Sequence, residues 1–182
     1  MKTELDLGCG TKKHKNAITL DMNPGVRPDK VLEIKRDVIL PFKSNTFDKI
    51  WMIDFLEHID DIAWLLSEVH RIGKPDSEVQ IQYPHFSHRN TYSDVTHQQR
   101  LGIRSLDHFD PSTELGRKYQ YYTFFGRNFP FKIENRDVLF YKGVVGTVQK
   151  TLHSLLGDDR YEIFVSSLLP IANIETRLRV LK

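Results

Sequence analysis

The sequence has a single cysteine, Cys9, and no apolar run that approaches the roughly 18 residues of a membrane span. One cysteine excludes an intramolecular disulfide framework and is compatible with a reducing compartment. The first residues, 1–4, are not followed by an apolar core, so we expect no signal peptide. The formal net charge is only +2, too small to indicate nucleic acid or an anionic membrane as a partner. We therefore expect a cytoplasmic protein.

Internal repeats, low-complexity segments and linkers are also missing. With 182 residues, the chain is long enough to bury a core and most simply forms one domain. Histidine is comparatively abundant, with eight residues that can change charge near neutral pH. We therefore expect a single domain in which histidines set the charge around pH 7.

The N-terminal stretch Glu4–Thr11 combines a short apolar run with two glycines. The run predicts a buried strand over about residues 3–7. Gly8 and Gly10 then allow a sharp turn and a close approach of a ligand to the backbone. A second apolar run ends at Asp21, whose carboxylate can accept both hydroxyls of a ribose. Together these features indicate a nucleoside-type cofactor site in an α/β sheet.

Only residues 11–16 connect the glycine turn to the second predicted strand, over about 17–20. A parallel crossover normally needs a dozen or more residues, usually with a helix. Six residues span ~20 Å only when nearly extended, so the first crossover helix is predicted to be short or absent. One sheet face beside this segment then lacks its usual cover. We expect the helices of residues 143–169 or a second subunit to cover it.

Later segments alternate between strand and helix patterns. Residues 47–53 form a strong buried strand, and residues 62–72 place apolar side chains on one helical face after a capping Asp60 or Asp61. This alternation indicates a mostly parallel sheet. Further strands are predicted over about 30–38, 79–83, 131–141 and 174–181, and further helices over 143–156 and 159–169.

A series of motifs follows this order of elements. They are Leu-Asp-Leu-Gly-Cys-Gly (5–10), Leu-Asp-Met-Asn-Pro (20–24), Ser-Asn-Thr-Phe-Asp-Lys-Ile (44–50), Phe-Leu-Glu-His-Ile (55–59), Glu-Val-His-Arg-Ile-Gly-Lys-Pro (68–75) and Tyr-Pro-His-Phe-Ser (83–87). In order and spacing, the chain resembles the class I S-adenosylmethionine-dependent methyltransferases. More narrowly, it resembles a small type 11-like subgroup with a shortened first crossover. The family usually has Gly-Gly where this chain has Asp76-Ser77.

The resemblance implies an α/β, Rossmann-like three-layer sandwich. Its mostly parallel seven-stranded sheet would have the order 3-2-1-4-5-7-6, with an antiparallel last strand over 174–181. We expect residues 1–182 to form a single methyltransferase domain. Within it, residues 85–130 are rich in histidine, serine and aromatic residues and are predicted to form an acceptor-binding insertion or lid.

The resemblance also implies S-adenosylmethionine as the cofactor. The glycine turn would contact its amino-acid part, Asp21 the ribose, and Asp37 the adenine amino group, with Glu33 as the alternative to Asp37. A missing third glycine and the short crossover argue against a dinucleotide. Cys9 is expected to be a buried spacer rather than a nucleophile. The predicted cofactor-binding residues are Asp6, Gly8, Cys9, Gly10, Asp21, Met22, Asp37, Val38, Asp54 and Phe55.

The catalytic candidates are His97, His85 and His58, because a histidine near its ordinary pKa suits general-base chemistry at neutral pH. No metal is predicted, although the i, i+3 spacing of His85 and His88 leaves a metal-dependent hydrolase as the least favoured hypothesis. The preferred hypothesis is methyl transfer to a small-molecule acceptor, and the alternative is a non-catalytic S-adenosylmethionine-binding module. Nucleic acid and membrane partners are not indicated, and a homo-oligomer is left open.

Overall fold

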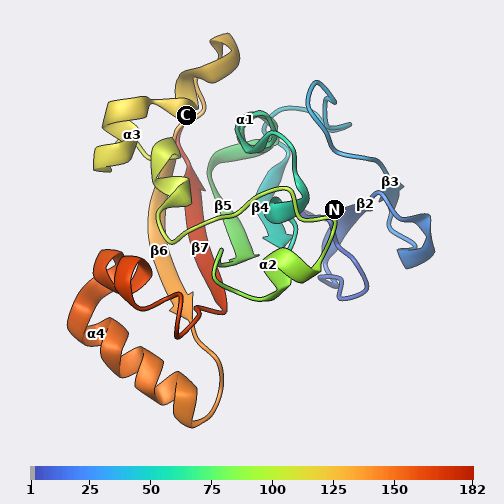
Figure 1. Cartoon of the computed structure of the whole chain (residues 1–182). Coiled ribbons are helices and arrows are strands. Elements are labelled where there is room, and N and C mark those ends of the chain that lie inside the picture. Colours follow the sequence, from blue (N-terminus) through green and yellow to red (C-terminus); the bar gives the residue numbers. More distant parts are fainter. Residues whose placement is uncertain (1–2) are drawn as a thin grey trace.

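The sheet has seven strands in the order β3-β2-β1-β4-β5-β7-β6 in the computed structural model, which describes residues 3–182 (Figure 1). β1 to β5 pair in parallel, whereas β7 is antiparallel to both of its neighbours, β5 and β6. The predicted strand order and the antiparallel last strand are confirmed. The strands are β1 (Glu4–Leu7), β2 (Ala17–Asp21), β3 (Lys30–Val31), β4 (Phe47–Ile53), β5 (Gly73–Pro84), β6 (Phe131–Leu139) and β7 (Asn173–Val180).

The first crossover contains no helix, as predicted from its length. Its residues turn back along the sheet, and β2 begins opposite the start of β1, with Glu4 paired to Ala17. Asp6 fixes the path of this connection. One of its carboxylate oxygens accepts hydrogen bonds from the His14 backbone N–H at 2.9 Å and lies 3.2 Å from the His14 ring.

One face of the sheet is apolar and carries helix α1 (Ile62–Ile72). The helix begins after Asp61, whose side chain accepts from the Trp64 backbone N–H at 2.9 Å and satisfies one of the free donors of the first turn. Alternate residues of β1, β4 and β5 point toward it, as expected for a strand period of two. The resulting core includes Leu5, Leu7, Ile50, Met52, Leu65, Leu66, Val69, Ile72, Val79 and Ile81, all at most 1% exposed.

The opposite face of the same strands is polar and partly exposed, as the intermediate burial of Glu4, Lys49 and Trp51 shows. His14 from the short crossover stacks on Trp51, with ring centroids 4.0 Å apart, and the Trp51 indole N–H donates to Glu4 at 2.9 Å. The prediction that the helices of residues 143–169 cover this region is wrong. Helix α4 (Val144–Phe164) lies at the other end of the sheet, beside β6 and β7 (Figure 1).

Two predicted elements differ from the structure in length. The strand expected over 30–38 is only the two residues of β3, because after the Leu32 N–H bonds to the Asp21 carbonyl the chain forms a local turn closed by Val38. β5 begins at Gly73, earlier than expected, and passes through Asp76 at φ +60°. Asp76 therefore adopts the left-handed conformation at the position where the family usually has glycine.

The remaining elements are short and lie between the strands. α4 is interrupted at Gly157 (φ +76°), in agreement with the two helices predicted there. No helix among residues 3–182 is both long and apolar enough to cross a membrane. The short elements are η1 (Pro24–Val26), η2 (Leu56–His58), α2 (Asn90–Ser93), η3 (Ser105–Phe109), α3 (Glu114–Tyr119) and η4 (Tyr121–Gly126).

Candidate functional site

The glycine turn follows β1 at the carboxyl edge of the parallel strands, where α/β sheets bind their ligands. The backbone N–H groups of Gly8 and Cys9 donate to the Leu20 carbonyl at 2.8 and 3.2 Å. Gly8 has φ +67°, and a Cβ placed on it would lie 2.1 Å from the Phe55 ring. Gly8 is therefore needed both for its backbone conformation and for the close approach of Phe55.

Asp21 is tied to the same turn. One carboxylate oxygen accepts from the Gly10 N–H at 2.9 Å, and the other accepts from the Asn23 N–H at 2.8 Å. Each carboxylate oxygen has a second lone-pair direction, so Asp21 can hold the turn and accept hydrogen bonds from a ligand. Cys9 is buried beside it, and burial, followed by the charges of Asp21 and Asp6, raises the pKa of its thiol. The Cys9 thiol is therefore kept protonated, as a spacer would be.

The other predicted cofactor residues are more exposed. Asp37 lies in the loop after β3 at φ +66°, and the next residue, Val38, accepts a long hydrogen bond from the Trp64 indole at 3.4 Å. Glu33, its alternative, is 3.2 Å from the Lys35 ammonium, whereas Asp37 is 4.0 Å from Arg36. The preference for Asp37 stays a prediction, as does a contact from Met22, which is 65% exposed.

A cavity of about 450 Å³ lies at the ends of β4 and β5 and the start of β7. Asp54, at the end of β4, accepts from the Gln82 side chain at 3.0 Å and lies on the cavity wall. Its neighbour in the chain, Phe55, packs against Gly8, so adjacent residues of the chain contact the cavity beside the glycine turn and the turn itself. Its lining residues are Asp54, Glu57, His58, Pro84, His88, Asn90, Asp94, His97, Ala172 and Asn173.

Three of these residues converge on one point. Glu57, His58 and His97 each offer a ligand atom, and these atoms lie within 4.8 Å of one another. The rings of His58 and His97 meet edge to face at 4.7 Å, and His97 Nε2 is 3.9 Å from Glu57 Oε1. Burial raises the pKa of Glu57 to about 8, and burial and the neighbouring His58 lower the pKa of His97.

Hydrogen bonds from Gln98 and Gln99 to residues 57–59, called the latch below, hold these distant parts of the chain together. The N–H groups of Gln98 and Gln99 both donate to the Glu57 carbonyl, at 2.8 and 3.0 Å. Their side-chain amides donate to the carbonyls of His58 and Ile59, 40 positions earlier in the chain. His97 is thereby held beside η2. Sequence reasoning missed the importance of Glu57, and its only signal was an acid within the apolar stretch 55–59 directly before a histidine.

His85 does not join this cluster. Its side chain is fully buried, and its ring nitrogens lie 2.7 Å from Ser87 Oγ and 2.8 Å from Glu162 Oε1. Both nitrogens are therefore engaged in the interior, which leaves neither for an acceptor nor for the metal site once considered with His88. His85 acts as a structural link between β5 and α4, and the reason for expecting it in catalysis is gone.

Residues 5–81 match the family model of a methyltransferase domain, and this segment contains the glycine turn, Asp21, Asp54 and the Glu57–His58 pair. The sheet order agrees with the order that the motifs imply. The family match covers less than half of the chain, and the fold is the one found in solved S-adenosylmethionine-dependent methyltransferases. The methyltransferase-domain match implies S-adenosylmethionine as the cofactor.

Solved structures support the methyltransferase fold. A chain from the complex of the Haloferax volcanii Trm112 methyltransferase activator with a methyltransferase shares 16% identity at a TM-score of 0.59, over 100% of this chain and 83% of that one. An S-adenosylmethionine-dependent methyltransferase from Archaeoglobus fulgidus gives the same identity and TM-score over 97% and 85%. The [4+2]-cyclase SpnF shares 15% identity at 0.53 over 98% and 74%.

At these identities the likeness concerns the fold, and the cyclase shows that the fold alone does not fix the chemistry. No curated protein shows significant sequence similarity to the chain. These similarities identify no methyl acceptor.

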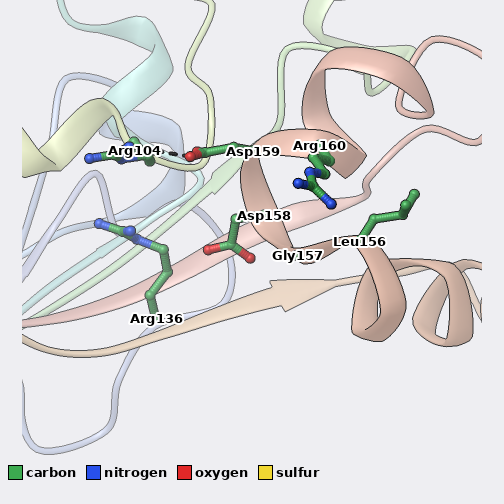
Figure 2. A pocket seen from close by; sticks show the side chains of 7 residues that line it. All are labelled: Arg104, Arg136, Leu156, Gly157, Asp158, Asp159 and Arg160. Atoms are coloured by element: carbon green, nitrogen blue, oxygen red, sulfur yellow. Dashed lines mark hydrogen bonds and ion pairs between the residues drawn. The ribbon is translucent and has the colours of Figure 1, made fainter.

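A second cavity, of about 410 Å³, lies where α4 is interrupted at Gly157 (Figure 2). Its charged side chains largely neutralise one another: Arg104 is paired with Asp159 at 3.5 Å and with Asp107 at 2.9 Å, and Arg136 is also paired with Asp107. It shares no lining residue with the cavity beside the glycine turn.

Proposed function

We propose that the protein transfers the methyl group of S-adenosylmethionine to a small or medium-sized acceptor bound in the cavity beside the glycine turn. The observation that carries this proposal is that two adjacent residues serve the two parts of the site: Asp54 lines the cavity, and Phe55 packs against the glycine turn. A cofactor held at the turn would thus reach an acceptor directly. Residues 85–130 contribute His88, Asn90 and Asp94 to that cavity, which supports their proposed acceptor-binding role.

The cofactor supplies an activated methyl group on its sulfonium, and the chain's work is to position both reactants and exclude water. In this proposal the backbone around Gly8 and Gly10 binds the amino-acid part of the cofactor and Asp21 accepts from its ribose hydroxyls. Asp37 and the Val38 N–H bind the adenine. Asp6 is a positioning residue, because it holds the crossover that closes the turn.

His97 and His58 are the proposed groups that accept a proton from the acceptor, since both line the cavity. His85 is withdrawn from this role because both of its ring nitrogens have buried partners. The cytoplasmic location stays a prediction from the sequence.

Calorimetry with S-adenosylmethionine and S-adenosylhomocysteine tests the cofactor part of the proposal. We expect both to bind the wild-type chain, and Asp48→Asn to bind as well as wild type. Asp48 pairs with Lys74 at the far end of β4, so it is a matched aspartate outside the site. Absence of binding by both ligands would overturn the proposal.

Radiolabelled methyl transfer to fractions of a metabolite extract tests the reaction. Label in a small-molecule product, lost when the cavity residue His97 is changed to Asn, is the expected result. Cofactor binding without transfer to any fraction would instead favour the non-catalytic binding module.

A further inference from the structure

Two buried polar atoms without hydrogen-bond partners lie in the same small cluster. Among residues 3–182, Glu57 Oε2 and His97 Nδ1 are both buried and have no partner. Glu57 is 2% exposed and the His97 side chain 6%. An unpaired carboxylate in the interior is costly unless a cation compensates it. The other carboxylate oxygen, Glu57 Oε1, lies 3.9 Å from His97 Nε2, too far for a hydrogen bond.

The hydrogen bonds around His58 determine which of its nitrogens is free. Asp94 Oδ1 accepts from the Thr96 hydroxyl at 2.6 Å, and the carboxylate can only accept, so Thr96 uses its one proton there. The same hydroxyl lies 3.0 Å from His58 Nδ1 and must accept from it. A neutral His58 therefore carries its proton on Nδ1 and presents the lone pair of Nε2, which is the arrangement of a metal-binding histidine with a supporting outer partner.

We propose that Glu57, His58 and His97 bind one divalent transition-metal ion of the Zn²⁺ or Fe²⁺ type. Two imidazoles and one carboxylate are a recurrent ligand set for these metals, with coordination positions left open. Their ligand atoms lie within 4.8 Å of one another. Since bonds to zinc are about 2.0–2.2 Å long, small side-chain rotations would complete the site. The Gln98 and Gln99 latch holds the two ligand segments together before an ion arrives.

The metal would also take part in the reaction, an inference that rests on the proposed function. The ligands line the acceptor cavity, so an open coordination position would take an oxygen atom of the acceptor. A bound metal lowers the pKa of such an oxygen and replaces a general base. In that case His58 and His97 are metal ligands and do not accept the proton themselves.

Co²⁺ is a suitable probe because it replaces zinc and absorbs visible light. Tag-free protein is treated with a chelator, exchanged into buffer and titrated with Co²⁺, while the visible absorption bands are recorded. We expect one Co²⁺ per chain, and at least a tenfold loss of affinity in Glu57→Gln and in His97→Asn. His153→Gln is the control, because His153 pairs with Asp158 far from the cavity and its loss should leave Co²⁺ binding unchanged.

The Co²⁺ affinity of Thr96→Val distinguishes a metal site from a polar cluster that binds no metal. It keeps all three ligands and removes only the hydroxyl that fixes the His58 proton, so we expect about tenfold weaker Co²⁺ binding. Wild-type protein that binds no Co²⁺, or binds it equally well after Glu57→Gln, overturns the metal site. S-adenosylhomocysteine binding is measured on every variant as a test of folding. Cofactor binding without Co²⁺ binding refutes only the metal, and the reverse refutes only the proposed function.

Discussion

The glycine turn and the neighbouring cavity both lie at the carboxyl ends of the parallel strands, but they differ in whether their polar side chains have hydrogen-bond partners. On the glycine-turn side, Asp6 and Asp21 both accept hydrogen bonds from backbone N–H groups, and all of these partners lie within 11 positions in the chain. On the cavity side, Glu57 and His97 come from separate segments and keep buried atoms without partners. The first side has its carboxylates paired within the fold and is called the complete side below, whereas the second, the incomplete side, keeps the unpaired atoms that the proposed metal would engage.

The largest effect on stability is expected from a substitution in the glycine turn, on the complete side. Gly8→Ala would place a Cβ 2.1 Å from the Phe55 ring at φ +67°, and we expect a loss of about 3 kcal/mol in the free energy of unfolding. Gly10→Ala is the matched control, because at φ +49° its Cβ would meet no atom within 4 Å. Urea denaturation checks both. Equal losses in the two variants would show that Phe55 does not constrain the turn.

Glu68 is the satisfied counterpart of Glu57, since both are buried glutamates. Glu68 accepts from Arg71, Arg127 and the Leu40 N–H. Glu68→Gln should cost about 3 kcal/mol at pH 7, because it leaves two arginines without their buried partner. Urea denaturation at pH 7 measures it, and a loss under about 1 kcal/mol would mean that the network contributes little.

The pH dependence of this loss has a defined sign. Burial alone would raise the pKa of Glu68, but the bonds from Arg71, Leu40 and Arg127 bring it below its ordinary value of 4.5. Its contribution is therefore present above the ordinary pKa and is lost as the pH falls through the lowered pKa. The wild type and Glu68→Gln should accordingly converge in stability at low pH, and a constant difference down to pH 3 would contradict the lowered pKa.

Asp21→Asn tests the cofactor role of the complete side. A charged hydrogen bond contributes roughly 1.5–3 kcal/mol, so S-adenosylhomocysteine should bind about ten- to a hundredfold more weakly. Calorimetry measures the change, with Asp48→Asn as the control. Unchanged affinity would remove Asp21 from the ribose site.

The smallest effect is expected on the incomplete side and has the opposite sign. Burial raises the pKa of Glu57 to about 8, so at pH 7 the side chain must take up a proton when the metal-free protein folds. Glu57→Gln removes this cost with a neutral amide of the same shape, so stability at pH 7 should rise by about 1 kcal/mol. Thermal unfolding with excess chelator checks this. A destabilised variant would show that Glu57 has a partner in solution and that the contrast with Glu68 is mistaken.

The same difference explains what could be predicted from the sequence. The glycine turn, Asp21 and the short crossover lie close together in the chain, so spacing and residue type were sufficient to predict them. The sheet order was implied by the resemblance to the methyltransferase family. The Glu57–His58–His97 cluster depends on the latch at Gln98 and Gln99, a contact across 40 positions that no local pattern reveals. For the same reason the sequence predicted His85 as a catalytic residue, because its hydrogen bond with Glu162, 77 positions away, leaves no local pattern.

The short first crossover also has a consequence for how the chain folds. A parallel strand pair normally forms late, because a long connecting segment must be ordered before the strands meet. Here Glu4 and Ala17 are paired across only nine connecting residues between β1 and β2, from 8 to 16. Closing so small a loop loses little chain entropy. We expect this first pair to be among the earliest long-lived structure, and the cofactor turn to exist before the cavity beside it has been assembled.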